Sequence, residues 1–109
     1  MDTTAQPVVS AALNLLWTRF LPQMRERLDL IETVAQSCAN GRMTYRQTTQ
    51  ARDAAHKLAG SLGTFGLTRG SVLGHEIEMM LSSTDLPTPD EADHMLNLSA
   101  ELRELVENR

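Results

Sequence analysis

The sequence has few aromatic side chains: among its 109 residues there are one Trp, one Tyr and two Phe, or 4%. Pockets for flat organic ligands and stacking platforms for nucleic-acid bases usually contain more of them. Basic residues are also in the minority, because 10 Lys and Arg face 14 Asp and Glu and leave a formal net charge of −4. Non-specific nucleic-acid binding depends on neutralising phosphates with Lys and Arg, so we expect no nucleic-acid partner.

Long hydrophobic runs and cysteines are scarce as well. No apolar run approaches the ~18 residues that a membrane-spanning helix needs, and we expect no contact with a membrane. The segment Met1 to Pro7 lacks the basic-then-apolar order of a signal peptide. The single Cys38 cannot form an internal disulfide, which fits a reducing compartment. We therefore expect a cytoplasmic protein.

What the chain does contain suits one globular domain. A length of 109 residues, with 41% hydrophobic and 22% charged residues, is about one domain's worth. A chain of this size buries enough surface to fold without disulfides or metal ions. We expect a single domain over residues 1–109, with residues 1–7 flexible.

Helix-forming residues dominate, and apolar positions recur every three or four residues. One such stripe runs from Val9 to Leu21 and a second from Gln23 to Cys38, and we expect both to face the core. We expect Pro22 to kink one long helix rather than to end it, because the stripe continues through it nearly in phase.

Further helices are predicted downstream. One starts near Thr44 as the N-cap, with Gln47 completing a capping box. Another starts at Thr68 as the N-cap, and a last one follows the prolines, with Thr88 or Asp90 as its cap. Strand-like alternation is missing from the sequence. Four to five amphipathic helices with short connections favour an all-α, antiparallel up-down bundle.

The stretch around His56 does not fit a purely structural pattern. In a helix, His56 lies one position beyond the apolar seam and should stand at its edge, with the ring reaching water. The seam consists of Ala51, Ala55, Leu58 and Leu62. Ala59 and Gly60 follow on the same face as His56 and leave the surface beside the imidazole almost bare. Gly in a helix costs about 1 kcal/mol relative to Ala, so Gly60 indicates either clearance for an approaching group or a close helix–helix contact. Gly70 and Gly74 are more simply packing points.

An open imidazole can act as a nucleophile. Model imidazoles titrate near pH 6.5, so a neutral nitrogen is available at pH 7. That nitrogen can attack a phosphoryl group and carry it as a phosphoramidate. Arg52 and Lys57 are the candidate supporting charges for His56, and Arg52 is the better placed, since Lys57 points about 100° round the helix. Ser61 either bonds back to a backbone carbonyl or lies near the histidine.

Residues 56–61 read His-Lys-Leu-Ala-Gly-Ser, and Gly66 follows ten positions after the histidine. This order resembles the signature of the histidine-containing phosphotransfer (HPt) domain family, His-x-Leu-Lys-Gly-Ser with a second glycine at that distance. Ile77-Glu78 is similar to a Leu-Glu pair on the family's next helix. The resemblance covers most of the chain. It departs at Ala59, where the family usually has a Lys thought to support the phosphoryl charge; Arg52, Lys57 or the partner's own Lys could substitute.

The resemblance implies an antiparallel up-down four-helix bundle with an additional N-terminal helical segment. It implies that His56 is phosphorylated on Nε2 and exchanges the phosphoryl group with an aspartate of a response-regulator receiver domain. The chain would have no autokinase activity and no cofactor of its own, and Mg²⁺ would belong to the receiver. An upstream hybrid sensor histidine kinase is the further expected partner, and we expect a monomer.

Other interpretations stay open at this point. The chain could be a non-catalytic helical adaptor in which His56 is not phosphorylated, an alternative motivated by Ala59. It could also be a fragment of a larger sensor kinase or hybrid regulator. We expect no metal site, because His75-Glu76 begins like the zinc motif His-Glu-x-x-His but Met79 stands in the place of the second histidine.

Overall fold

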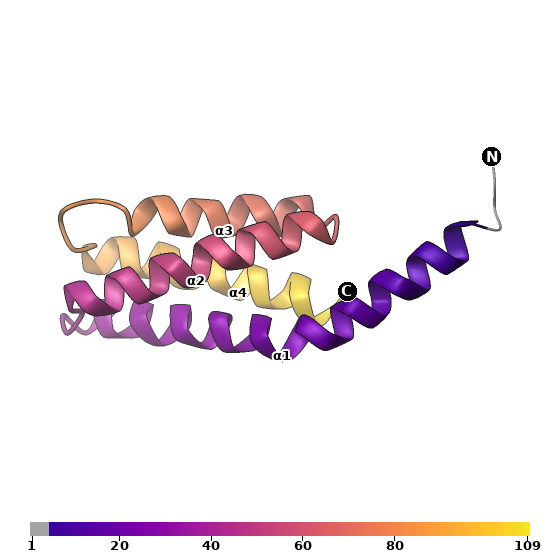
Figure 1. The fold of residues 1–109 in the computed structure, drawn as a ribbon. Helices are drawn as coiled ribbons and strands as arrows, with labels where there is room; N and C mark the ends of the chain where they lie inside the picture. Colours follow the sequence, from indigo (N-terminus) through magenta and orange to yellow (C-terminus); the bar gives the residue numbers. More distant parts are fainter. Residues whose placement is uncertain (1–4) are drawn as a thin grey trace.

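The computed structural model describes the backbone of residues 5–109 and the side chains of residues 10–109. This part of the chain forms four α-helices: α1 (Ala5–Ala39), α2 (Tyr45–Thr64), α3 (Thr68–Met80) and α4 (Pro89–Glu107). They run alternately up and down (Figure 1). α1 packs against α2 and α4, and α3 packs against the same two helices, so the helices close into a ring around one core. The prediction of an all-α helical bundle is confirmed.

The core is almost entirely aliphatic and draws on all four helices. Its largest fully buried side chains are Met24, Leu28, Ile31, Val34, Leu58, Leu62, Leu73, Ile77, Leu81, Met95, Leu102 and Val106. Burial of a side chain of this size stabilises the fold by roughly 1.5–3 kcal/mol. The apolar stripes predicted from helical spacing are therefore, for the most part, the helix faces that pack against one another in the core.

Helix α1 is continuous for 35 residues with Pro22 inside it, as expected. Its N-terminal part extends past the end of the bundle (Figure 1). Residues 1–4 of the segment expected to be flexible lie outside the described residues, and residues 5–7 belong to α1. Within residues 5–109, no helix combines the length and the apolar character needed to cross a bilayer.

The expectation that the first apolar stripe faces the core is wrong for most of its described side chains. Trp17 is buried, but Leu16 and Phe20 are 41% and 45% exposed. The reason is geometric: this part of α1 projects beyond its neighbours, so no helix lies opposite the stripe. Trp17 is covered instead by Phe65, edge-on at 5.2 Å between ring centroids, and by the Arg109 guanidinium at 4.7 Å from its ring.

Ion pairs join α1 to α4 along the outside of the bundle. Arg103 donates hydrogen bonds to Glu32 (2.8 Å) and Asp29 (2.6 Å), and Arg25 donates to Glu107 (2.7 Å). The hydrogen bond from Arg25 lowers the pKa of Glu107 below its ordinary value of 4.5. The stabilisation is therefore present at neutral pH and is lost as acid protonates the carboxyl group. Exposed pairs of this kind contribute little individually.

Two of the predicted helix starts are confirmed and one is wrong. Thr44 and Thr88 cap α2 and α4 in capping boxes with Gln47 and Glu91. Asp90 lies inside the first turn of α4 and is not its cap. Capping boxes satisfy backbone N–H groups that the first turn leaves without partners, so both starts are encoded locally.

Thr68, in contrast, is the first helical residue of α3, and Leu67 occupies the N-cap without a side-chain hydrogen bond. The preceding turn fixes this start. Gly66 adopts a positive φ of 79°, and the Leu67 N–H donates to the Leu62 carbonyl at 2.9 Å. Leu67 is partly buried against the core, so apolar packing rather than a hydroxyl cap sets the entry into α3.

Helices α2 and α3 approach closely at the two buried glycines of α3. A Cβ atom at Gly74 would lie 3.0 Å from the Ala59 Cβ atom and 3.1 Å from its Cα atom, and one at Gly70 would lie 2.8 Å from Leu62. The prediction that Gly70 and Gly74 are packing points is confirmed. A Cβ atom at Gly60 would meet nothing within 4 Å, so the alternative of a helix–helix contact at Gly60 is wrong.

Gly74→Ala and Gly60→Ala should therefore change stability in opposite directions. We expect Gly74→Ala to lower the free energy of unfolding by about 1 kcal/mol, because the added methyl group presses on the backbone of α2. We expect Gly60→Ala to raise it by about 0.5–1 kcal/mol, because alanine is the better helix former and has open space there. Urea denaturation measures both, and a stabilised Gly74→Ala variant would contradict the close contact.

Candidate functional site

His56 lies in the middle of α2, at the edge of its buried face. The seam residues Ala51, Ala55, Leu58 and Leu62 are all fully buried, whereas the His56 side chain is 72% exposed. The predicted position of the imidazole, at the edge of the core with its ring in water, is confirmed. The buried seam fixes the rotation of α2 about its own axis, and this rotation determines where the ring stands.

Glu78 on α3 holds one edge of the imidazole. The Nδ1 atom of His56 lies 2.8 Å from Glu78 Oε2, and the Glu78 side chain is only 21% exposed. An ionised carboxylate accepts hydrogen bonds but cannot donate them. The contact therefore assigns the proton of the neutral ring to Nδ1 and leaves a free lone pair on Nε2. Nε2 is the nitrogen that can act as a nucleophile.

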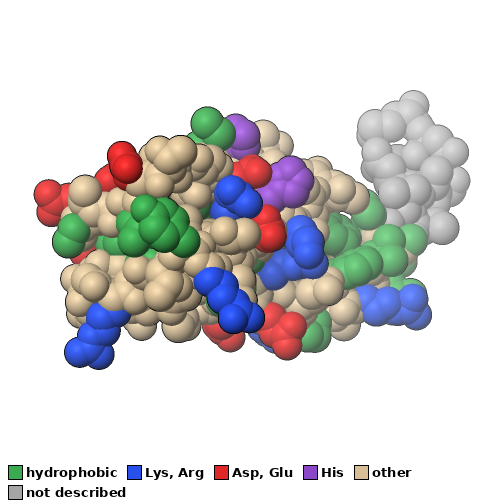
Figure 2. Space-filling model, turned by 60° about the vertical axis from the view of Figure 1, so that its left-hand side comes forward, with side chains coloured by type: hydrophobic (Ala, Val, Ile, Leu, Met, Phe, Trp, Pro, Cys, Tyr) green, Lys and Arg blue, Asp and Glu red, His purple; other side chains and the backbone are tan. Residues whose placement is uncertain are grey.

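A shallow cleft between α2 and α3 surrounds this ring. It is lined by His56, Ala59, Gly60, Ser71, His75 and Glu78. On the face shown in Figure 2, histidine side chains lie next to acidic and basic ones. Gly60 leaves open space beside the ring, and Ala59 is 8% exposed where it packs on Gly74. The cleft floor therefore consists of small side chains, which leaves the ring accessible to a large partner.

The other predicted site residues lie outside this cleft. Lys57 lines a groove on the α1 side of α2, together with Arg27 and Asp53. The Arg52 guanidinium lies 3.9 Å from the Asp53 carboxylate. Ser61 is half-buried, and its carbonyl accepts the Phe65 N–H at 3.2 Å. None of these three supporting residues lines the cleft, and their roles stay predictions.

Sequence reasoning missed the roles of Glu78 and His75 in the cleft. Both come from α3, and each contacts a partner within the site: His75 Nδ1 lies 3.4 Å from the second oxygen of Glu78. One feature of the sequence could have indicated Glu78: it follows the buried Ile77 and therefore lies at the edge of the buried face of α3, as His56 does on α2. Using it required the register of α3 against α2, which local spacing does not contain.

Metal binding finds no support in the part of the chain that the structure describes. No group of three or more His, Cys, Asp and Glu side chains there is arranged to hold an ion. His94 lies apart from the cleft and contacts Glu76, with 3.6 Å between Nε2 and Oε1.

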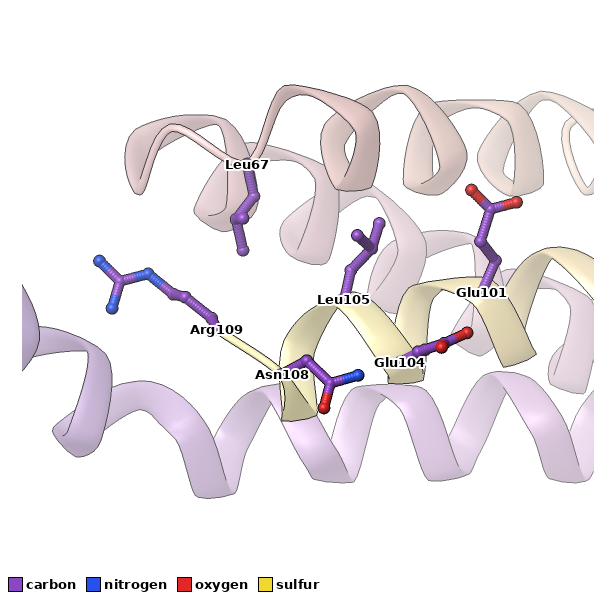
Figure 3. Close-up of a pocket in the computed structure, with 6 residues that line it drawn as sticks. All are labelled: Leu67, Glu101, Glu104, Leu105, Asn108 and Arg109. Carbon is purple, nitrogen blue, oxygen red and sulfur yellow. The ribbon is translucent and has the colours of Figure 1, made fainter.

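A second hollow lies at the C-terminal end of α4 (Figure 3). Its lining consists of Leu67, Glu101, Glu104, Leu105, Asn108 and Arg109. Glu101 is engaged by Arg69, whose Nε lies 2.8 Å from Oε2, and this hydrogen bond lowers the pKa of Glu101. The lining contains two carboxylates and no histidine or thiol, so it offers no nucleophile comparable with His56.

This helical bundle presents the exposed imidazole of His56 beside a carboxylate, and comparison with known proteins identifies its family. The model of the Hpt domain family matches residues 15–108. Protein RcaC of Microchaete diplosiphon is 33% identical over 108 residues, which cover 99% of this chain and 17% of RcaC. No solved structure matches the chain.

The chain belongs to the Hpt domain family. It is a phosphotransfer module of phosphorelay signalling, and Hpt domains are phosphocarrier modules. The suspected resemblance is thereby confirmed. The chain spans about a sixth of the length of RcaC, since it covers 17% of that protein.

The contact with Glu78 predicts the tautomer of the neutral ring. At pH 8 we expect His56 to carry its proton on Nδ1, because the carboxylate accepts it there. In Glu78→Ala the ring should revert to the tautomer mixture of a free imidazole. Two-dimensional ¹H–¹⁵N NMR of the imidazole nitrogens distinguishes the two forms, and His94 supplies an internal control. An Nε2–H tautomer in the unmodified chain would contradict this assignment.

Proposed function

We propose that His56 carries the phosphoryl group on Nε2 and exchanges it with an aspartate of a response-regulator receiver domain. The observation that supports this most directly is the 2.8 Å contact between Nδ1 and Glu78. It holds the ring by one edge while the side chain as a whole stays 72% exposed. A nucleophile that must be reached by another protein needs both properties: a fixed orientation and an open approach.

The proposed transfer moves the phosphoryl group between an oxygen atom of the receiver and a nitrogen atom of this chain. The Nε2 lone pair attacks the phosphorus atom of the receiver's aspartyl phosphate. An N–P bond forms as the bond between phosphorus and the carboxylate oxygen breaks, and the carboxylate leaves with the electron pair. The ring keeps its Nδ1 proton and becomes cationic, facing the negative Glu78, which stabilises the charge that develops. The reverse step returns the phosphoryl group to an aspartate.

The chain's own part in this exchange is limited to the nucleophile, its orientation and a docking surface. The receiver would contribute the aspartate and the Mg²⁺ that offsets phosphoryl charge. We assign no autokinase activity to the chain. An upstream hybrid sensor histidine kinase would supply the phosphoryl group through a receiver domain of its own. A cytoplasmic location is part of the proposal, and the single, buried and unpaired Cys38 fits it.

The docking surface would surround the cleft. Val72 and Met79 lie on α3 and are 51% and 60% exposed. With His75 between them at helical spacing, they form one exposed stripe along α3. Apolar side chains beside an exposed nucleophile provide contact area for a protein partner. We propose that the receiver covers this stripe and the exposed face of α2, and that the chain binds it as a monomer.

The direct test is transfer from a panel of ³²P-phosphorylated receiver domains. We expect acid-labile, base-stable label on the wild-type chain and none on His56→Gln. His94→Gln is the matched control, because His94 lies away from the cleft beside Glu76, and it should be labelled like the wild type. Equal label on His56→Gln would contradict the proposal. A receiver that binds wild type and His56→Ala equally, without any transfer, would favour the adaptor alternative.

Filling the space beside His56 should block this exchange. We expect Gly60→Leu to slow transfer by about tenfold or more, because its side chain enters the approach path and must be displaced at a cost typical of overpacking. Gly60→Ala adds a single methyl group to the same open space and serves as the control. Circular dichroism should show unchanged helix content in both variants. Wild-type transfer rates in Gly60→Leu would refute the clearance role of Gly60.

A further inference from the structure

The cleft contains a second imidazole that shares the carboxylate of the first. His75 lies on α3 with its side chain 67% exposed, and its Nδ1 atom is 3.4 Å from Glu78 Oε1. The other oxygen of the same carboxylate lies 2.8 Å from His56 Nδ1. One carboxylate from α3 therefore faces two imidazoles, one from each helix that lines the cleft.

The cleft contains few groups that could offset the negative charge of a phosphoryl group, and His75 is one of them. A phosphoryl group on His56 brings two negative charges next to the negative Glu78, and the cationic ring offsets only one of them. Among the described residues that line the cleft there is no Lys or Arg. Lys57 lines the groove between α1 and α2 instead, and the Nε atom of Arg52 lies 3.9 Å from the Asp53 carboxylate. Apart from His56 itself, His75 is the lining residue that can become cationic.

The other charged groups near His75 leave it free for this role. On its own helix, Glu78 faces it, whereas Glu76 contacts His94 of α4. From α2, His56 lines the same cleft. Helix α1 does not pack against α3 and brings no charge to it. Glu78 and His56 are therefore the charged or titratable groups that share the cleft with His75.

We propose that protonated His75 is the cation that supports the phosphoryl group on His56. This inference rests on the proposed function of His56. Once His75 binds a proton, its ring offsets the charge of Glu78 and of the phosphoryl oxygens, and it lies in the same cleft as both. Because imidazoles gain a proton between pH 8 and pH 5, the support strengthens as the pH falls. His75 thereby makes phosphorylation of His56 sensitive to pH.

The experiment uses phosphoramidate as a small phosphoryl donor, so no particular receiver is needed. The P–N bond of the donor breaks as the Nε2–P bond of His56 forms, and ammonia leaves after taking a proton from water. ³¹P NMR measures the initial rate of phosphohistidine formation from pH 5.5 to pH 8.5. The chains compared are wild type, His75→Gln, His75→Lys and the control His94→Gln. Dividing each rate by that of His75→Gln at the same pH removes the pH dependence of the donor and of His56.

We expect the wild-type ratio to be close to one at pH 8.5 and to rise to about fivefold at pH 5.5, the size expected for one added charge near the phosphoryl group in a solvated cleft. His75→Lys should stay at about that level throughout the range, because its charge does not titrate there. His94→Gln should follow the wild type. His75 is largely exposed, so these variants should fold like the wild type, as urea denaturation can verify.

The outcomes separate this inference from the proposed function. If His56 accepts label but the wild-type ratio stays flat with pH, His75 gives no charge support and the inference is overturned. Equal losses in His75→Gln and His75→Lys at every pH would show a merely structural role and overturn it as well. If the wild-type chain takes no label on His56 from phosphoramidate or from any receiver, the proposed function itself fails.

Discussion

The close approach of α2 and α3 is the constraint on which the site depends. Gly74 has no side chain, and a Cβ atom there would lie 3.0 Å from that of Ala59. One turn further along α3, Glu78 reaches His56 at 2.8 Å. A carboxylate on a short side chain cannot span a wider gap, so the spacing of two backbones decides whether the imidazole is oriented. The close contact between Gly74 and Ala59 thus allows Glu78 to reach and orient His56.

Helix α2 is both firmly packed in the core and open to solvent at His56. A continuous buried seam holds the helix in place, and His56 needs no strained backbone to reach water, since the positive φ values within residues 5–109 belong to Gly41 and Gly66. Gly60 lowers the stability of α2 relative to an alanine, although a Cβ atom at this position would meet nothing within 4 Å. In the proposed function, the approaching receiver uses this space.

Local patterns predicted the parts of the structure that are encoded locally. The capping boxes at Thr44 and Thr88, the continuous helix through Pro22 and the edge position of His56 all follow from spacing along one helix. The exposed stripe around Phe20 did not, because periodicity shows which face is apolar but not whether a neighbour covers it. The partnership of Glu78 with His56 and His75 was missed for the same reason, since it depends on the register between two helices.

The contacts of the functional site are much more local in sequence than the ion pairs between α1 and α4. Arg25 and Glu107 are 82 residues apart in the chain, whereas His56 and Glu78 are separated by only 22. Bringing distant segments together is slower and entropically costlier than closing a short hairpin. The α2–α3 hairpin, joined by residues 65–67, is therefore the most local unit of the bundle. His56 and Glu78 thus come from one short stretch of chain, whereas the core that fixes the rotation of α2 also includes side chains of α1 and α4.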